Sequence, residues 1–209
     1  MILRNRTDRT VGATLLLMRK LSATALIPIM LATALTSAAW AEPARYLLDA
    51  PRSQVGFTYY FGTSSDDGTM PLASADLVID LDNLSASQID VAVDASGART
   101  GFFLATQALR GARVLDTDRH PLIRFRSERV RAVGTRVDID GSFTIRGVTR
   151  PGQLTAQLFQ QPGNLDAPGH DLSLLLTGAV NRSEFGADGF AGQVGDRVDL
   201  RILARISRQ

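Results

Sequence analysis

The sequence contains no cysteine, and it has only two histidines and one tryptophan among its 209 residues. Without cysteine the chain cannot form a disulfide, and it offers neither a thiol nucleophile nor a thiolate ligand for a metal. His120 and His170 each stand alone in polar, turn-forming sequence, outside the spacings typical of zinc sites. We therefore expect two solvated loop histidines, and neither a metal site nor a cofactor.

Familiar catalytic motifs are missing as well. The sequence has no Gly-x-Ser-x-Gly nucleophile elbow and no glycine-rich phosphate-binding loop. Ser183 has no plausible base near it in the sequence and is interpreted as a turn residue. Asp116 and Asp118 beside His120 could hold a cation, but the pattern is more typical of a helix terminus or an Asx turn. The sequence predicts no catalytic residue.

Lysine occurs once, as Lys20, so every basic residue after position 41 is an arginine. Residues 1–41 hold five of the 23 basic residues and one of the 21 acidic ones. Residues 42–209 therefore carry 18 basic and 20 acidic residues, a net charge of −2. A negative balance does not support electrostatic capture of nucleic acid, which we do not expect as a partner.

Long hydrophobic runs are also missing. The apolar stretch at residues 21–35 is shorter than the roughly 20 residues that a membrane-spanning helix needs. It follows Arg19 and Lys20 and precedes Ala39-Trp40-Ala41, which places small residues where signal peptidase cleaves. We predict a cleavable signal peptide over residues 1–41, with Met18 as an alternative start, and export to the periplasm. An uncleaved membrane anchor is the alternative.

Residues 42–209 are expected to form one domain dominated by β-strands. Apolar and polar residues alternate with the period of two that is typical of strands. The alternation predicts eight or nine strands, whose apolar faces are centred on residues 55–59, 77–81, 89–93, 123–125, 137–145, 154–158, 172–176 and 198–206. Residues 66–68 are expected to lie in a loop. A helix is predicted over residues 101–110, with Phe103, Leu104, Gln107 and Ala108 on one face.

This pattern predicts an all-β fold, an eight-stranded antiparallel barrel with one or two short helices. A closed barrel hides the apolar faces and leaves no strand edge exposed, although a two-sheet sandwich is the alternative. The polar faces carry charges such as Asp80, Arg124 and Arg205, which argues against an outer-membrane barrel with its apolar exterior. Gly56 and Gly141 interrupt strand patterns and would help a barrel to bend.

An eight-stranded barrel has room for side chains or one small ligand, so its core and its ligand wall can coincide. Apolar candidates for this wall are Phe57, Tyr59, Phe102, Phe103, Phe125, Phe143 and Leu174. Arg146 and Arg182 lie near turns at strand ends and are the polar candidates, because a guanidinium group suits the oxygens of a ligand head group. The alternative for both arginines is a structural pairing with carboxylates such as Glu184 or Asp116.

Several segments together resemble a known family. They are residues 46–49 (YLLD), 53–57 (SQVGF), 115–125 (LDTDRHPLIRF), 141–150 (GSFTIRGVTR) and 181–186 (NRSEFG). In this order and spacing they resemble the YceI-like family of exported bacterial polyisoprenoid-binding proteins. The resemblance implies a lipocalin-like barrel, an elongated apolar pocket for an isoprenoid chain and no catalytic residues. The chain departs from the family pattern at Arg52, at Tyr60 and Phe61, and over residues 62–75.

Three functions fit these observations. The first is a binding protein that carries, stores or sequesters a long isoprenoid-type lipid, a quinone or a prenyl phosphate. The second is a barrel enzyme that modifies such a lipid, which would need an inward-pointing charged residue. The third is an envelope accessory protein of a membrane electron-transfer partner of cytochrome type. The head group of the lipid and the oligomeric state, including a homodimer, stay open.

Overall fold

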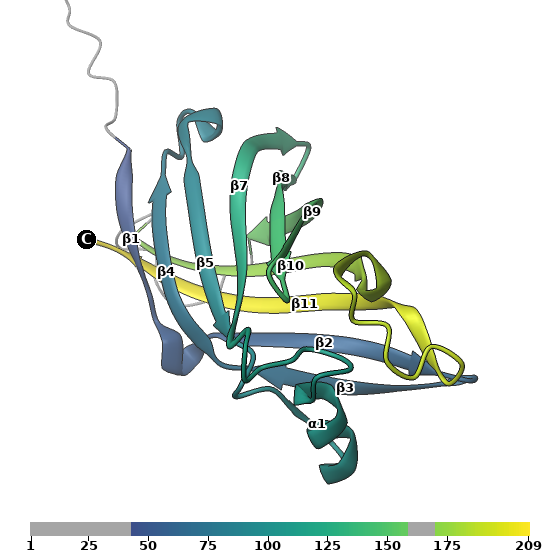
Figure 1. The fold of residues 1–209 in the computed structure, drawn as a ribbon. Coiled ribbons are helices and arrows are strands. Elements are labelled where there is room, and N and C mark those ends of the chain that lie inside the picture. Colours follow the sequence, from purple (N-terminus) through teal and green to yellow (C-terminus); the bar gives the residue numbers. More distant parts are fainter. Residues whose placement is uncertain (1–42, 159–169) are drawn as a thin grey trace, which may run out of the picture. The chain divides into compact units, whose positions relative to one another are not determined.

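The computed structural model describes residues 43–158 and 170–209, which form one continuous antiparallel sheet (Figure 1). The predicted signal peptide lies outside the described residues. The strands are β1 (Ala44–Leu48), β2 (Gln54–Phe61), β3 (Ser64–Met70), β4 (Leu72–Ile79), β5 (Gln88–Asp94), β6 (Arg99–Thr100), β7 (Leu122–Val133), β8 (Arg136–Ile145), β9 (Val148–Leu158), β10 (Asp171–Asn181) and β11 (Val194–Arg208). The helices are α1 (Phe103–Arg110) and the 3-10 turns η1 (Ala50–Arg52), η2 (Leu84–Ala86) and η3 (Arg182–Phe185). In these residues, no helix is long and apolar enough to cross a membrane.

Eight strands close the sheet into a barrel. The order β1-β4-β5-β7-β8-β9-β10-β11 returns to its start because β1 also pairs with β11, where Tyr46 faces Arg208 and Leu48 faces Ile206. Closure gives the strands of this ring partners on both sides and excludes the two-sheet sandwich. The prediction of an eight-stranded antiparallel barrel is confirmed.

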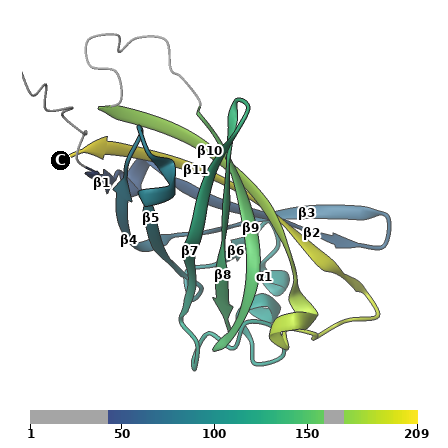
Figure 2. The ribbon, with the colours of Figure 1, turned by 90° about the horizontal axis from the view of Figure 1, so that it is seen from above.

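The remaining strands, β2, β3 and β6, continue the sheet beyond β11 in that order (Figure 2). Along the chain, β2 follows β1, β3 precedes β4 and β6 follows β5. The last residues of β11 pair with β1, and its earlier residues pair with β2, so β1 and β2 share one long partner. Two hydrogen bonds bridge the interruption between them: Asp49 N donates to Arg205 O (2.8 Å), and Arg205 N donates to Ser53 Oγ (3.0 Å). Pro71, which has no N–H to donate, separates β3 from β4. The interrupted strands let the sheet bend away from the closed ring.

Residues 66–68 lie in β3, so the loop predicted there is wrong. Asp66 faces Tyr59 of β2, and Gly68 faces Phe57. The segment carries no apolar alternation that a sequence pattern could detect, and pairing with β2 and β6 makes it a strand. The surrounding sheet thus overrides the weak strand propensity of Asp and Gly.

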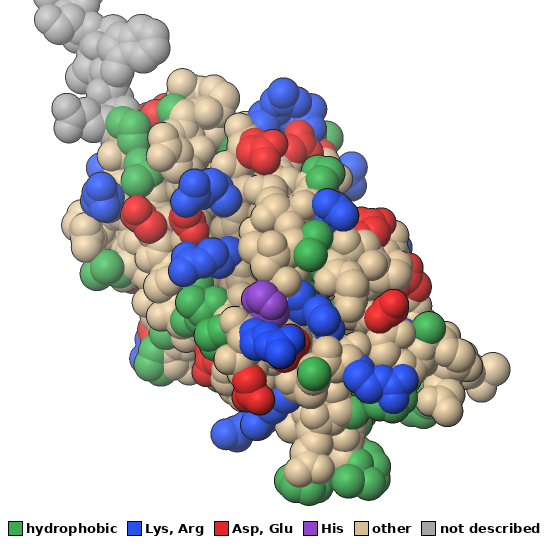
Figure 3. Space-filling model, viewed as in Figure 1, with side chains coloured by type: hydrophobic (Ala, Val, Ile, Leu, Met, Phe, Trp, Pro, Cys, Tyr) green, Lys and Arg blue, Asp and Glu red, His purple; other side chains and the backbone are tan. Residues whose placement is uncertain are grey.

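The outer face of the barrel is charged, as the alternation predicts. Figure 3 shows acidic and basic side chains interspersed over one face of the molecule. Several form cross-strand ion pairs, among them Arg126 with Asp90 (2.7 Å) and Arg131 with Asp140 (2.8 Å). Exposed pairs of this kind contribute about 0–1 kcal/mol each, so they favour solubility more than stability. The stability of the barrel therefore rests mainly on its apolar interior.

Candidate ligand cavity

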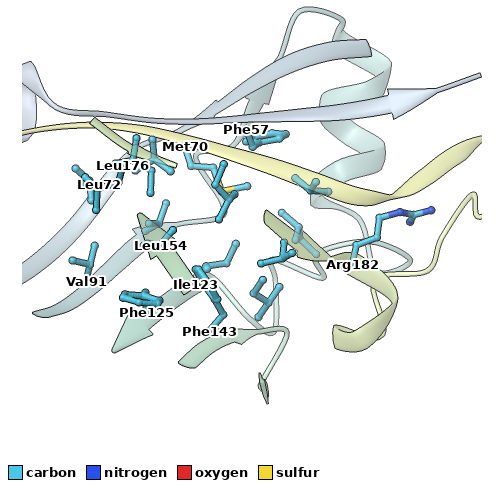
Figure 4. Close-up of a pocket in the computed structure, with 18 of the residues that line it drawn as sticks. Phe57, Met70, Leu72, Val91, Ile123, Phe125, Phe143, Leu154, Leu176 and Arg182 are labelled. Atoms are coloured by element: carbon cyan, nitrogen blue, oxygen red, sulfur yellow. The ribbon is translucent and has the colours of Figure 1, made fainter. Parts of the chain in front are cut away.

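The inward faces of the strands line a cavity of about 410 Å³, within the range of small-molecule binding sites (Figure 4). Its wall is built from aliphatic and aromatic side chains of nearly every strand, including Val91, Ile123 and Leu176. Among the described residues, the polar side chains in the lining are Tyr59, Thr100, Arg182 and Gln193. A wall of this composition excludes water and favours an apolar ligand.

Aromatic rings form two parts of the wall. Phe125 of β7 and Phe143 of β8 are directly paired across strands, with ring centroids 4.7 Å apart and planes tilted by 50°. The rings of Phe57 and Tyr59 on β2 lie 6.4 Å apart. Tilted pairs at these distances are favourable arrangements for aromatic rings. The wall is therefore set by cross-strand register as well as by composition.

Two glycines make room for these rings. A Cβ atom at Gly152 would lie 2.5 Å from Cδ2 of Phe143, and one at Gly68 would lie 2.0 Å from Cζ of Phe57. Each ring therefore lies directly over the backbone of a neighbouring strand. A side chain at either glycine would push the aromatic ring out of its present position.

Five of the seven apolar residues predicted for the ligand wall line the cavity: Phe57, Tyr59, Phe125, Phe143 and Leu174. Phe102 and Phe103 do not, because they lie at the start of α1 with exposed fractions of 59% and 71%. The helix itself is confirmed, but of the four residues predicted to share one face only Ala108 lines the cavity, and Phe103 and Leu104 are exposed. Ala105 and Leu109 join Ala108 in the lining, and their spacing of three and four residues is equally helical.

Arg182 is buried, with 8% of its surface exposed, and it lines the cavity near η3. Its guanidinium group donates to four backbone oxygens: Ala187 O and Gly189 O (both 2.6 Å), Val194 O (2.8 Å) and Gly195 O (2.8 Å). In Figure 4 the side chain extends away from the other labelled residues. Arg182 thus organises the segment between η3 and β11 through carbonyl groups, and the predicted carboxylate partner Glu184 bonds to Asn181 instead.

Arg146 has a similar structural role but lies outside the cavity lining. It adopts a left-handed backbone conformation with φ of 52° in the turn between β8 and β9. Its guanidinium donates to Ala112 O (3.0 Å) and Val114 O (2.7 Å) in the segment after α1. Because Val114 lines the cavity, the hydrogen bond from Arg146 to its backbone oxygen holds this part of the wall in place.

The polar end of the cavity lies where β2, β3 and β6 meet α1. Tyr59 Oη donates to Asp66 Oδ2 (3.0 Å), and Thr100 Oγ1 lies 3.1 Å from Thr106 Oγ1. Burial, followed by the hydrogen bond to Asp66, raises the pKa of Tyr59. The hydroxyl proton is donated to Asp66, so toward the cavity the Tyr59 oxygen can act only as an acceptor. Sequence reasoning missed Asp66 because it assigned this residue to a loop.

The other candidates from the sequence do not assemble a catalytic or metal site. Ser183 Oγ donates to Asp196 Oδ2 (2.8 Å), a carboxylate that also accepts the Ser183 backbone N–H. Asp116 is buried and lies 3.6 Å from the Arg119 guanidinium, while His170 lies 3.4 Å from Asp171. No group of three His, Cys, Asp or Glu residues that could hold a metal occurs in residues 43–158 and 170–209.

Comparison with known proteins agrees with this architecture. The family model described as a YceI-like domain matches residues 46–206, which run from within β1 to near the end of β11. The chain belongs to the YceI-like family. The resemblance found in the sequence motifs is thereby confirmed.

Relatives of this YceI-like chain include Protein YceI of Shigella flexneri, 29% identical over 149 residues, which cover 71% of this chain and 74% of the relative. A UPF0312 protein of Pectobacterium atrosepticum is 28% identical over 156 residues, covering 74% and 77% of the two chains. Among solved structures, BcnA of Burkholderia cenocepacia has a TM-score of 0.68 at 16% identity, with 76% and 99% covered. A polyisoprenoid binding domain from Saccharophagus degradans, implicated in plant cell wall breakdown, has a TM-score of 0.58 at 14% identity, with 79% and 99% covered.

Proposed function

We propose that this protein holds a long isoprenoid-type lipid, a quinone or a prenyl phosphate, in its barrel cavity for transport, storage or sequestration in the periplasm. The observation that carries this proposal is the cavity inside the barrel with its almost wholly apolar wall. Membership of the YceI-like family supports it, as does the fold shared with a domain described as polyisoprenoid-binding.

Of the two head groups, a neutral one fits the cavity better. Arg182 is the cationic residue among the described lining residues, and four backbone oxygens already occupy its guanidinium group. A phosphate inside the cavity would therefore be a buried charge without a free cationic partner, which is strongly unfavourable. We accordingly propose that a neutral ring lies within reach of Tyr59 and Thr100, whose hydroxyl protons are donated to Asp66 and Phe102 O and whose oxygens can accept from the hydroxyl group of a quinol or phenol. A phosphate head would have to stay outside.

Binding fits this cavity better than catalysis does. Catalysis on a lipid would need a nucleophile, or a proton donor and acceptor, held close to the reacting carbon. Among the polar groups described in the lining, Arg182 bonds to backbone oxygens, and Tyr59 donates to Asp66 but is a poor nucleophile at neutral pH because burial raises its pKa. A role beside a cytochrome-type membrane partner stays compatible with lipid binding, since a quinone is the lipid that such a partner would use.

Organic extraction of the purified protein, followed by mass spectrometry, tests the proposal. An intact isoprenoid bound in near-stoichiometric amount is expected. The test variant is Ala156→Phe, because Ala156 of β9 is 5% exposed and lines the cavity, so the new ring would fill part of it. This variant should carry much less lipid, while Gln157→Phe on the outward face of the same strand should carry the normal amount. A protein that neither carries nor takes up a neutral isoprenoid would refute the proposed function.

A further inference from the structure

Three large apolar side chains project together at the start of α1. Phe102, Phe103 and Leu104 have exposed fractions of 59%, 71% and 61%, the highest among the large hydrophobic residues described. Figure 3 shows hydrophobic side chains protruding at the end of the molecule where Figure 1 places α1. Single exposed apolar residues are ordinary on protein surfaces, whereas a contiguous group indicates an interaction site. We call residues 102–104 the apolar tip.

The apolar tip and the cavity lie on the two sides of one short helix. Ala105, Ala108 and Leu109 on the inner side of α1 line the cavity. Thr100, two residues before Phe102, lines the polar end of the same cavity and donates to Phe102 O (3.0 Å). Only the thickness of α1 therefore separates the cavity from a surface that the apolar tip contacts.

The sequence around the apolar tip is basic. Residues 95–115 contain three arginines, Arg99, Arg110 and Arg113, and no acidic residue, although residues 42–209 have a net charge of −2. Arg99 precedes α1 in the sequence and Arg113 follows it, and both are exposed. Asp66 lies near Gly101 and keeps its negative charge while it accepts the hydrogen bond from Tyr59, so it offsets one of the three arginines. An apolar group flanked by arginines complements the surface of a bilayer that contains anionic lipid.

The size of the apolar tip separates a membrane from a second copy of the chain. From the area that aromatic and aliphatic side chains bury, the three exposed side chains offer roughly 300–400 Å². A stable protein interface needs about 800 Å² from each partner. Shallow insertion into a bilayer has no such minimum and gives weak, reversible attachment, as with a single short lipid anchor.

We propose that the apolar tip inserts into the surface of an anionic lipid bilayer and so places the α1 end of the barrel against the membrane. The flanking arginines attract the lipid head groups, and the two phenylalanines and the leucine enter the acyl boundary. Attachment of this kind places the cavity beside a reservoir of water-insoluble lipid. It also goes beyond the proposed function, since the tip would bind lipid whatever the cavity contains.

A tryptophan placed in the tip tests this proposal. The one natural tryptophan, Trp40, is replaced in Trp40→Phe, and Phe103→Trp then provides a probe whose emission reports its own surroundings. Vesicles of phosphatidylethanolamine with a minor share of phosphatidylglycerol should shift this emission to the blue, and brominated lipids should quench it. The matched control is Leu81→Trp in the same background, because Leu81 is 52% exposed and precedes η2, at the opposite end from α1 in Figure 1.

Two further measurements complete the test. Phe102→Ser combined with Leu104→Ser in the probe protein should weaken the vesicle-induced shift about tenfold in lipid concentration, and added salt should weaken it further. Unchanged emission of the tip tryptophan with vesicles, or equal quenching of the Leu81→Trp control, would overturn the proposal. So would a blue shift that depends on protein concentration without vesicles, because it would identify a second copy as the occupant. No isoprenoid is present, so the result is independent of the proposed function.

Discussion

At the scale of single residues, the two faces of each strand have very different tolerance for charge. Phe125 of β7 is 7% exposed and lies in the cavity wall, whereas its neighbour Arg124 points outward. Phe125→Asp should lower the free energy of unfolding by about 4 kcal/mol, because it removes a buried ring and adds an unpaired buried carboxylate. Denaturant unfolding measures the loss. The control Arg124→Asp should change stability by less than about 1 kcal/mol, and similar losses in both variants would contradict the assigned faces.

The tyrosines provide a second test at this scale. The chain has three, Tyr46, Tyr59 and Tyr60. Burial raises the pKa of Tyr46 and of Tyr59, and the hydrogen bond to Asp199 raises that of Tyr60. Tyrosinate absorbance of the native protein should therefore develop only above the ordinary pKa of 10.0.

This elevation also links tyrosine ionisation to stability. A pKa raised by folding contributes stability that is fully present below pH 10.0 and is lost as the pH rises through the folded-state pKa. The free energy of unfolding should fall with pH in this alkaline range, and Tyr59→Phe should make the fall shallower. A steeper or unchanged fall in Tyr59→Phe would contradict the buried hydrogen bond to Asp66.

At the scale of elements, the packing of rings over glycines makes a specific prediction. Gly152→Ala should destabilise the barrel by about 1–3 kcal/mol, because the new methyl group would overlap the buried ring of Phe143. The cost should shrink in the double variant with Phe143→Leu, which relieves the overlap, and unfolding of the four proteins forms a mutant cycle. The control is Gly192→Ala, where an added Cβ meets nothing within 4 Å. Equal effects of Gly152→Ala and Gly192→Ala would contradict this packing.

The elements also show what local sequence can and cannot predict. The alternation at residues 55–59, 89–93 and 198–206 predicts strands correctly, and the side chains predicted to face inward line the cavity. The strand β3 has no such alternation, so only its pairing with β2 and β6 reveals it. For α1, both sides of the helix contain apolar residues, and the sequence does not decide which side faces the cavity. The smaller Ala105 and Ala108 are inside, which leaves Phe103 outside.

At the scale of the whole barrel, closure depends on contacts between the two ends of the described chain. Tyr46 of β1 faces Arg208 of β11, and no local pattern specifies that pairing. Sequence alternation therefore left both a barrel and a sandwich open, although it predicted the composition of the interior. The role of Arg146 depends on long-range geometry too, because it donates to backbone oxygens 32 and 34 residues away in the sequence. Arg182 donates to oxygens only 5 to 13 residues away, but the sequence pattern does not show how that segment folds back on it.

Closure gives the cavity a finite volume, and a finite volume predicts how affinity depends on ligand length. Burying a methylene contributes about 0.8 kcal/mol, so each five-carbon isoprene unit can add up to roughly 4 kcal/mol. Association itself costs about 4–15 kcal/mol, so a short terpene should bind weakly. Affinity for neutral quinones should therefore rise with each unit and then level off when the cavity is full.

Thermal unfolding with a series of quinones measures this dependence, because a ligand of the folded state raises the midpoint temperature. The midpoint should climb with chain length and reach a plateau. In Ala156→Phe the plateau should come at a shorter chain, since the new ring occupies part of the cavity, while Gln157→Phe on the outward face should behave like the unaltered protein. A rise that continues without a plateau, or that is the same in Ala156→Phe, would indicate adsorption on the surface of the barrel and contradict binding inside it.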